Sequence, residues 1–231
     1  MGQDKVWLPL EGQPLVVRMA KRIRPLVDDV IISTNTPEPF RSLASTLPMG
    51  VRTVVDQHPG MGPLAGLYSG LSAARHDLVV VLAVDMPFVS VRLLQYMICQ
   101  AGTFDAVVPL VSRGETESAW EPLHAVYKRS CLPAILSCLA AGEKKVIRFF
   151  SSIRVRCVLP EEIRRFDPDL SSFTNLNTPE DWHMAELLVT QRRSRGRLVQ
   201  QHLGASGQMY GHHAEGDVST PSISYMADSA A

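Results

Sequence analysis

The sequence predicts an α/β fold in which helices cover both faces of a mostly parallel β-sheet. Between residue 14 and about residue 110, apolar segments typical of strands alternate with segments that have helical spacing. The strand segments at residues 27–34 and 77–85 contain continuous apolar runs rather than alternating patterns. Continuous runs are typical of strands buried on both sides, and repeated strand–helix–strand order favours parallel pairing.

The expected elements follow one another in a regular order. We expect strands at residues 27–34, 51–56, 77–85, 105–110 and 153–159. We expect helices at residues 14–24, 38–45, 64–75, 91–100, 130–141 and 175–188. Thr178 can cap the last helix, and Pro179 suits its first turn, as Pro14 suits that of the first helix. Residues 111–127 are interpreted as a polar loop that leads into a short strand antiparallel to the rest.

Composition excludes several classes of protein. The 231 residues include 23 Lys and Arg and 23 Asp and Glu, so the formal net charge is zero. Proteins that bind nucleic acid or a membrane surface usually have a basic excess, so neither partner is expected. No apolar run is long enough to span a bilayer. The four cysteines are scattered, as is typical of small buried side chains in a reducing compartment, and we expect a cytoplasmic protein.

We interpret residues 1–188 as one domain and residues 189–231 as a disordered tail. Beyond residue 190, Gly, Ser, Gln and His dominate and large apolar side chains are few. The arginine cluster at residues 192–197 is interpreted as part of a solvated tail rather than as a contact with nucleic acid or acidic lipid. His212 and His213 are adjacent, which is a poor spacing for a metal site on a helix.

Polar and Gly-rich features follow the predicted parallel strands. Asn35 follows the first visible strand, Asp56 the second and Asp85 the third. The Gly-rich turn GMGPLAG at residues 60–66 opens a helix. In an open parallel sheet, ligands bind at the carboxyl ends of the strands. The sequence therefore predicts a binding site where these features converge.

Asp85 is a candidate ligand for a divalent cation. It ends a strand with a run of apolar residues before it, and Pro87 turns the chain shortly after it. A carboxylate at the rim of an apolar sheet suits Mg²⁺, which prefers oxygen ligands and bridges to phosphates. The alternative interpretation is that Asp85 caps a helix or stabilises a turn. The DMP context favours the metal.

Two Gly-containing segments are candidates for contact with a nucleotide. The turn that includes Gly62, Pro63 and Leu64 lets a base or ribose pack against backbone, or it is only a tight connection. In MGQDK, Lys5 offers a point charge for phosphate oxygens and Gly2 allows close approach of backbone amides. The chain has no GxxxxGK[ST] loop, no GxGxxG after a strand and no GxSxG. These absences argue against Walker-type ATPases, nicotinamide enzymes and α/β-hydrolases.

Taken together, several motifs resemble one enzyme family. MGQDK, LPLEGQPLV, VIISTN, VVD, GPLAGL, VLAVDMPF, EPLHAVY and NLNTPEDW occur in one register from residue 1 to about residue 188. In this order they resemble the molybdenum cofactor guanylyltransferases, which are nucleotidyltransferases with a Rossmann-like fold of the nucleotide-diphospho-sugar transferase type. The DMP, EPLHAVY and NLNTPED motifs point to the molybdenum branch. Cytidylyltransferase relatives usually have another residue before the proline of the DMP turn, which favours guanine.

The resemblance implies a reaction and a set of site residues. Members transfer GMP from GTP to the terminal phosphate of molybdopterin and release pyrophosphate. By position, Lys5 would bind the GTP phosphates, Asn35 and Asp56 would hold the nucleotide, and Asp85 would hold Mg²⁺. Four residues would border the pterin: Glu121, His124, Asn175 and Asn177. Further partners implied are molybdenum-insertion proteins and apoproteins of molybdoenzymes.

The family pattern that precedes MGQDK is absent from this sequence. In the family, a buried central strand runs into L-A-G-G-x-S-x-R, and Met1 aligns just after that arginine. Without a central strand we expect two unpaired strand edges and marginal stability, since domains are stable by only about 5–15 kcal/mol. Three hypotheses stay open: an active guanylyltransferase whose true start lies upstream, an inactive or binding-only remnant, and a relative that acts on cytidylyl or sugar-phosphate substrates.

Overall fold

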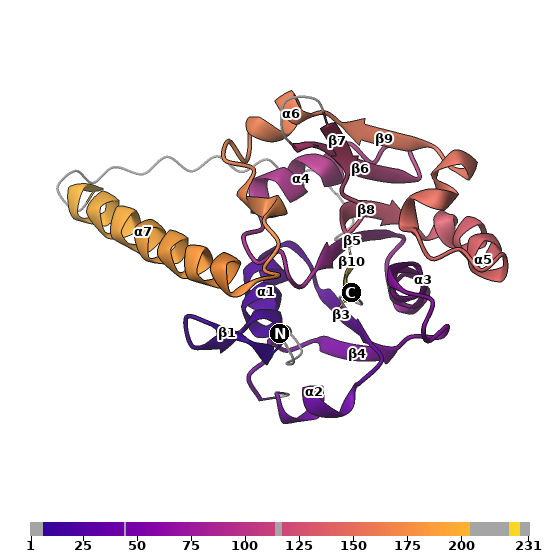
Figure 1. The fold of residues 1–231 in the computed structure, drawn as a ribbon, viewed down its shortest axis with the longest axis horizontal. Helices are drawn as coiled ribbons and strands as arrows, with labels where there is room; N and C mark the ends of the chain where they lie inside the picture. The colour runs from indigo at the N-terminus through magenta and orange to yellow at the C-terminus, as the bar shows by residue number, and fades with distance from the viewer. Residues whose placement is uncertain (1–6, 44, 114–116, 204–221, 227–231) are drawn as a thin grey trace.

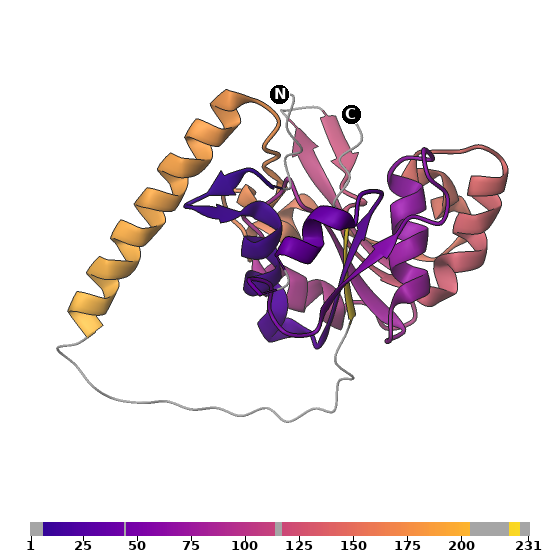
Figure 2. The ribbon, with the colours of Figure 1, turned by 90° about the horizontal axis from the view of Figure 1, so that it is seen from below.

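Among the described residues, an eight-stranded sheet forms the centre of the protein, and helices cover both of its faces (Figures 1 and 2). The structure is a computed structural model that describes residues 7–43, 45–113, 117–203 and 222–226, with the backbone alone for 113, 192–203 and 222–226. The strands lie in the order β4-β3-β10-β5-β8-β6-β7, and β9 pairs with β6. A small separate sheet joins β1 and β2.

The elements have the following bounds. The strands are β1 (Pro9–Leu10), β2 (Gln13–Pro14), β3 (Asp29–Thr34), β4 (Val51–Val55), β5 (Leu78–Ala83), β6 (Ala106–Arg113), β7 (Glu117–Trp120), β8 (His124–Lys128), β9 (Val155–Val158) and β10 (Ser222–Met226). The α-helices are α1 (Leu15–Ile23), α2 (Glu38–Ser42), α3 (Pro63–Ala73), α4 (Val91–Cys99), α5 (Leu132–Ala140), α6 (Pro160–Arg164) and α7 (Pro179–Leu203). Short 3-10 helices are η2 (Arg24–Leu26), η3 (Arg129–Cys131), η4 (Val146–Ser152) and η5 (Ser171–Phe173).

The sheet is parallel on one side and mixed on the other. Strands β4, β3, β10 and β5 are parallel neighbours. Strand β8 is antiparallel to both β5 and β6, which matches the short antiparallel strand expected before residue 127. Strand β9 is parallel to β6, whereas β7 is antiparallel to it. The predicted α/β fold, with a mostly parallel sheet between two layers of helices, is confirmed.

Apolar side chains of the central strands alternate between two cores because successive residues of a strand point to opposite faces. Val30 and Ile32 of β3 join the core formed with α1 and α4, whereas Ile31 joins the core formed with α3 and α5. Strand β5 divides in the same way, with Val80 and Leu82 on the first face. Burial of each such side chain contributes roughly 1.5–3 kcal/mol, so these continuous runs hold the sheet between its helices.

Most expected elements occur within a few residues of their predicted ends, and the main difference lies after residue 110. Strand β6 continues to Arg113, and β7 pairs with it where a polar loop was expected. The sequence there is polar because β7 lies at the end of the sheet order and is only half-buried or exposed. Pro14 precedes α1 as its N-cap instead of standing in its first turn. The expected cap of the last helix is confirmed, because the Asp181 amide donates to Thr178 Oγ1 at 3.1 Å.

Two segments of the expected tail have secondary structure. Helix α7 continues past Leu188 to Leu203, and β10 lies inside the sheet. Strand β10 pairs with β3 on one side and β5 on the other, so the two unpaired edges expected for these strands are not found. The division into a domain of residues 1–188 and a disordered tail stays a prediction. Residues 212 and 213 lie outside the described residues.

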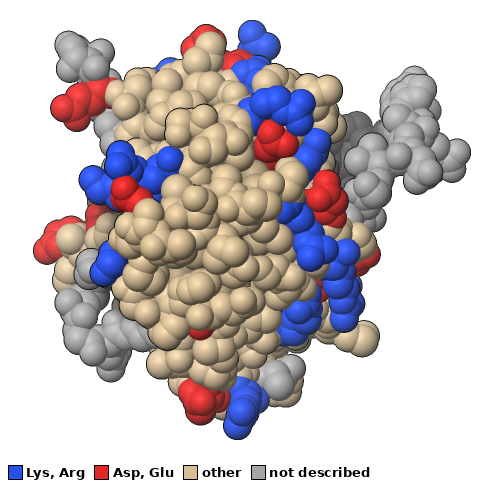
Figure 3. All heavy atoms as spheres, turned by 90° about the vertical axis from the view of Figure 1, so that its right-hand side faces the viewer, with Lys and Arg blue, Asp and Glu red and all other residues tan. Residues whose placement is uncertain are grey.

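The outer surface agrees with the balanced composition on the face that Figure 3 shows. Viewed from the side of α3 and α5, most of this face is uncharged, and groups of both signs lie toward its margins. None of the described helices combines the length and apolar composition needed to traverse a bilayer. All four cysteines are free, and Cys131 is fully buried, which raises the pKa of its thiol to about 12. Cys99 is exposed, in contrast to the expected burial.

Candidate functional site

The candidate site residues lie in a row along the carboxyl edge of the parallel strands. Asp56 follows β4, Asn35 follows β3, and Asp85 follows β5 by two residues. Because β4, β3, β10 and β5 are neighbours in that order, three strand spacings of about 4.8 Å separate the Asp56 strand from the Asp85 strand. The sheet therefore spreads these groups over about 14 Å of one edge, a width that suits an extended ligand.

Asp56 is held at the outer end of this row. Its side chain is 8% exposed and accepts a hydrogen bond from Ser33 Oγ on the neighbouring strand β3. The next amide, that of Gln57, donates to Ser69 Oγ of α3 at 2.9 Å. Asn35 is exposed just beyond the end of β3. Two buried hydroxyl groups thus fix the turn that carries Asp56, and a carboxylate has enough acceptor positions to receive further donors from a ligand.

The Gly-rich turn brings the amino end of α3 to the same edge. Gly62 has φ +66° and ψ −158°, a backbone conformation that residues other than glycine rarely adopt. Pro63 starts the helix. Leu64 is fully buried, so only its backbone amide can face a ligand. Lys144 lies next to this turn, because a Cβ placed on Gly62 would be 3.8 Å from Lys144 Cβ. A helix amino terminus beside an exposed lysine is electrostatically suited to phosphate.

Asp85 lies in a tightly fixed backbone. Its side chain is 8% exposed, and its carbonyl oxygen accepts a hydrogen bond of 2.9 Å from the Leu176 amide. Two residues earlier, the Ala83 amide donates to Leu123 O at 2.7 Å. These bonds join three segments that are far apart in sequence: the end of β5, the turn before β8 and the NLN segment before α7. They hold the backbone on which the Asp85 carboxylate stands.

The residues present fit a magnesium ion that shares its coordination with a substrate. The described part of the chain has no group of three His, Cys, Asp or Glu residues suited to holding a metal. A cage made only of protein is therefore not formed there. Mg²⁺ usually binds through one or two carboxylates together with waters and substrate phosphates, and a single rim carboxylate such as Asp85 satisfies that requirement.

The expected pterin-side residues lie on the far side of Asp85, near β8 and the start of α7. His124 pairs with Leu82 of β5 in the strand register and is 0% exposed, so it does not face a ligand directly. Glu121 is buried in the preceding turn. The Asn175 Oδ1 atom is buried, whereas Asn177 is exposed and its amide donates to Asp181 Oδ2 in the first turn of α7 at 2.9 Å.

His124 differs from an ordinary core histidine in its hydrogen bonding. Within the described residues, neither ring nitrogen has a hydrogen-bond partner, and the ring packs against Phe173 at 4.8 Å between centroids. Burial lowers the pKa of this imidazole to about 4, and the ring is therefore neutral at pH 7. A buried polar atom without a partner costs about 1–3 kcal/mol, so this histidine makes the core less stable than a hydrogen-bonded one would.

The structure places the predicted residues that follow β4, β3 and β5, those of the α3 turn and those near β8 and before α7 along one edge of the sheet, with His124 fully buried there. Lys5 lies outside the described residues. Four groups that contribute to the edge were not predicted from sequence: Ser33, Ser69, Lys144 and Leu176. The hydroxyls of Ser33 and Ser69 and the amide of Leu176 act through contacts between distant segments, and no local pattern signals them.

A cavity of about 420 Å³ lies elsewhere, between the end of α1, the start of α4 and the loop after α6. None of the predicted site residues lines it. Its lining includes Arg22, Ser90, Arg92, Asp167 and Asp169. The candidate site is therefore the row of polar groups at the sheet edge and not this cavity.

Comparison with known proteins identifies the family. Residues 1–156 match the family described as the MobA-like NTP transferase domain. The chain belongs to the MobA-like NTP transferases. A molybdenum cofactor guanylyltransferase from Pseudomonas fluorescens is 38% identical over 181 residues, covering 78% of this chain and 83% of that protein. Another from Desulfosudis oleivorans is 31% identical over 193 residues, covering 83% of this chain and 90% of that protein.

Solved structures of other MobA-like and nucleotidyltransferase proteins have the same fold. The molybdopterin-guanine dinucleotide biosynthesis protein A from Archaeoglobus fulgidus superimposes with a TM-score of 0.69 at 26% identity, covering 82% of this chain and 92% of that one. A 2-C-methyl-D-erythritol 4-phosphate cytidylyltransferase from Thermus thermophilus gives 0.62 at 18% identity, covering 80% and 92%. The second likeness concerns the fold alone. The family resemblance and the nucleotidyltransferase fold expected from the sequence are both confirmed.

Proposed function

We propose that this chain is a molybdenum cofactor guanylyltransferase, which transfers GMP from GTP to molybdopterin and releases pyrophosphate. The observation that carries the proposal is the order of groups along the sheet edge. Asp85 stands between Asp56 and the α3 turn on one side and the Glu121, Asn175 and Asn177 segments on the other. A transferase that joins two ligands needs two adjoining sites with a charge-stabilising group between them. Relatives named for this activity support the same proposal.

The nucleotide half of the site would recognise guanine through Asp56. A carboxylate accepts hydrogen bonds and donates none, so it suits the N1–H and N2 amino donors of guanine. The Ser33 hydroxyl already occupies one acceptor position and holds the carboxylate toward the edge. Asn35 and the backbone of Gly62, Pro63 and Leu64 would border the ribose and phosphates.

The reaction forms one P–O bond and breaks another. An oxygen of the molybdopterin phosphate attacks the α-phosphorus of GTP, and the bond from that phosphorus to the pyrophosphate oxygen breaks. Asp85 would hold Mg²⁺, which when bound neutralises charge on the phosphate oxygens. Lys5 would contribute a second positive charge to the same phosphates. The chain's part is positioning and electrostatic stabilisation, with no covalent intermediate.

GTP and molybdopterin are the proposed small-molecule substrates. Molybdenum-insertion proteins and apoproteins of molybdoenzymes are the proposed macromolecular partners, and the cytoplasm is the proposed location. A cytidylyl or sugar-phosphate substrate and a binding-only role are the alternatives. The described residues of the site favour neither alternative over guanylyl transfer.

The direct test is pyrophosphate release by the full chain with molybdopterin and Mg²⁺, using GTP, CTP, ATP and UTP in separate reactions. We expect GTP to be used at least 10-fold faster than any other nucleotide, with the dinucleotide product identified by mass. Preference for CTP would overturn guanine specificity, and release with a sugar phosphate but not molybdopterin would overturn the acceptor. Absence of turnover with bound GTP would leave only the binding role.

Asp56→Asn separates guanine recognition from general nucleotide binding. The side-chain amide of the variant would present N–H donors toward the N1–H and N2 donors of guanine. One good bidentate pair of hydrogen bonds to a base is worth roughly 1–3 kcal/mol of discrimination. We expect kcat/KM for GTP to fall by about 10–100-fold, with a smaller change for ITP, which lacks the N2 amino group. Asp77→Asn, at the opposite end of β5, is the matched control and should leave both values unchanged. Equal losses for GTP and ITP would contradict the guanine contact.

A further inference from the structure

Strand β10 comes from the far end of the sequence yet lies in the middle of the sheet. Ser222–Met226 is parallel to β3 on one side and to β5 on the other (Figures 1 and 2). The register is continuous on both sides: each residue from Ser222 to Met226 pairs with one residue of β3 and one of β5. A strand with two complete parallel ladders is a structural member of the sheet, unlike an edge strand paired on one side only.

The two strands beside β10 form a slot that is apolar on both faces. Val30, Ile31 and Ile32 on one side, and the run from Val79 to Leu82 on the other, are all 0% exposed. Unpaired amides and carbonyls on such buried strands would have no water to bind. The slot therefore requires a strand, and among the described residues β10 is the one that occupies it.

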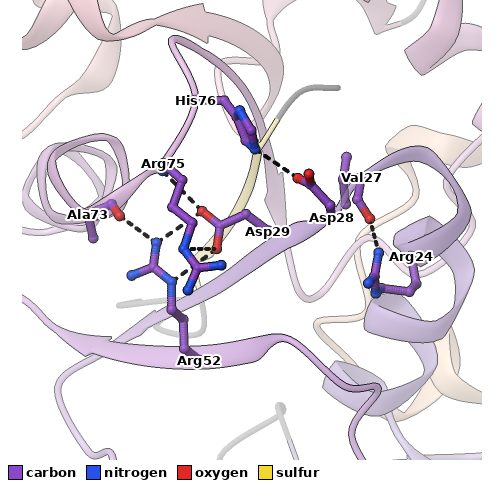
Figure 4. Close-up of polar contacts among 8 residues, drawn as sticks. All are labelled: Arg24, Val27, Asp28, Asp29, Arg52, Ala73, Arg75 and His76. Atoms are coloured by element: carbon purple, nitrogen blue, oxygen red, sulfur yellow. Dashed lines mark hydrogen bonds and ion pairs between the residues drawn. The ribbon is translucent and has the colours of Figure 1, made fainter. Parts of the chain in front are cut away.

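Polar contacts join the flanking strands at the amino end of this slot (Figure 4). His76 Nε2 lies 2.9 Å from Asp28 Oδ1, and the Arg75 amide donates to Asp29 Oδ2 at 3.1 Å. Asp28 and Asp29 lie at the start of β3, whereas Arg75 and His76 lie just before β5, and β10 begins beside Asp29. We name these four residues the clasp. The clasp links β3 and β5 at a separation of two strand spacings, about 10 Å, which is the width that one inserted strand needs.

The carboxyl end of β10 reaches the candidate site. Met226 pairs with Ser33 on one side and Ala83 on the other. Ser33 holds Asp56, and Asp85 follows Ala83 by two residues. Because β10 lies between β3 and β5, it adds one strand spacing to the separation between the strands that carry Asp56 and Asp85.

We propose that Ser222–Met226 is an in-chain docking strand that completes the sheet between the two strands that the clasp joins, and that it sets the separation between the Asp56 and Asp85 halves of the site. The sheet-completing role is independent of the proposed function, whereas the effect on substrate use rests on it. The proposed occupant is the segment of the same chain. The same segment of a second copy is the competing occupant.

Register-specific disulfide formation in the full chain tests the occupant. Ile223 pairs with Val30, whereas Ile32 is two residues further along the same strand and joins the same core. Paired Cα atoms of adjacent strands lie within the 4.4–6.8 Å that a disulfide spans, and partners two residues out of register do not. We expect Val30→Cys with Ile223→Cys to form an intramolecular bridge, located by peptide mapping, at least 5-fold more than Ile32→Cys with Ile223→Cys. The unsubstituted chain controls for its native cysteines.

Each other outcome overturns the proposal. A bridge between residues 30 and 223 of different molecules would assign the slot to a second copy. Equal bridging at residues 30 and 32, or none at either, would mean that the segment does not dock in this register. Because these readouts need no substrate, they stay valid if the proposed function fails.

A proline substitution tests whether docking matters to the fold and the site. Proline at Ser224 removes an amide donor from the middle of β10, and proline is tolerated poorly in central strands. Ser219→Pro, before the strand, is the matched control. We expect Ser224→Pro to lower the thermal midpoint by at least 5 °C relative to Ser219→Pro, and to reduce GTP-dependent turnover at a temperature where both are folded. Equal midpoints would show that β10 does not support the sheet. A lower midpoint with equal turnover would reject its effect on the site.

Discussion

The two ends of the parallel strands use polar residues in opposite ways. At the amino end, Asp29 is 1% exposed and accepts hydrogen bonds from Arg52 Nε and a terminal Arg52 nitrogen at 3.0 Å each, and from the Arg75 amide (Figure 4). Arg52 also donates to the Ala73 carbonyl at the end of α3. These charged groups bind one another and join β3, β4 and α3, although the buried Arg129 Nε near the start of β5 has no hydrogen-bond partner among the described residues. Such an arrangement has little capacity left for a ligand.

At the carboxyl end, buried polar groups keep hydrogen-bonding capacity. Both ring nitrogens of His124 and the Asn175 Oδ1 atom lack hydrogen-bond partners within the described residues. The acidic residues Asp56, Asp85 and Glu121 are gathered at the same end, each nearly buried. Unsatisfied buried groups cost stability, and proteins tolerate that cost mainly where function needs it. The comparison supports the proposal that the chemistry takes place at the carboxyl end, whereas the charged network at the amino end joins elements of the fold.

Asp85→Asn should have the largest effect of any single substitution, and that effect should concern activity alone. The change removes negative charge from the proposed Mg²⁺ position while keeping the shape of the side chain. We expect GTP-dependent pyrophosphate release to fall about 1,000-fold, equivalent to about 4 kcal/mol of transition-state stabilisation. The thermal midpoint should change by less than about 2 °C, because the backbone bond to Leu176 is retained. Asp77→Asn is the control, and near-native turnover by Asp85→Asn would remove the residue from this role.

Arg52→Ala tests the amino end. It leaves the buried Asp29 carboxylate without its bidentate partner, although the Arg52 side chain is 31% exposed and Arg75 Nε stays 3.9 Å from Asp29 Oδ1. We therefore expect a loss of roughly 2 kcal/mol in the free energy of unfolding, between the values for exposed and buried pairs. The matched control is Arg154→Ala, which breaks a similar two-nitrogen contact with Asp105, although the Arg154 side chain is 66% exposed. For Arg154→Ala we expect the free energy of unfolding to fall by at most about 1 kcal/mol. Urea unfolding measures both values, and equal losses would refute the special role of the buried contact.

The buried His124 predicts a dependence of stability on pH. Its pKa is about 4 in the folded chain, below the ordinary value of 6.5, so the unfolded chain binds the additional proton. Stability from this residue is therefore fully present above pH 6.5 and is lost as pH falls toward 4, by about 2 kcal/mol between pH 7 and pH 5. His124→Leu should remove that part of the loss in urea unfolding. The exposed His183→Leu should not, and identical pH profiles for both variants would contradict the effect assigned to burial.

Thr178→Ala gives the smallest expected effect and asks whether the α7 cap belongs to the site edge. Loss of the bond from the Asp181 amide should cost about 1 kcal/mol of stability. Because the cap adjoins the segment that bonds the Asp85 carbonyl, we also expect KM for molybdopterin to rise more than KM for GTP. Thr190→Ala, which removes a hydroxyl bond to Glu186 O within the same helix, should change neither KM. A rise in both KM values with Thr178→Ala would contradict a local effect.

The sequence predicted the central strands and helices well because their signals are local. The runs in β3 and β5 are apolar on both faces. The start of α7 is predicted by two adjacent residues, a capping Thr178 and Pro179 in the first turn. The sequence did not indicate β10, since SISYM lies among Gly, Ser and His residues and depends on partners about 140–190 positions away. For the same reason it indicated Asp56 and Asp85 but neither Ser33 nor the Leu176 amide, which hold them. The complete burial of His124 was likewise invisible until β8 was placed beside β5.

The most direct test of the central claim compares Asp85→Asn with Arg52→Ala in two measurements on each protein. These are GTP-dependent pyrophosphate release per folded molecule with molybdopterin, and the free energy of unfolding in urea. A crossed pattern is expected: Asp85→Asn loses turnover and keeps its stability, whereas Arg52→Ala loses stability and keeps turnover while folded. If both variants lose both properties to the same extent, the division between a structural and a chemical end of the sheet is wrong.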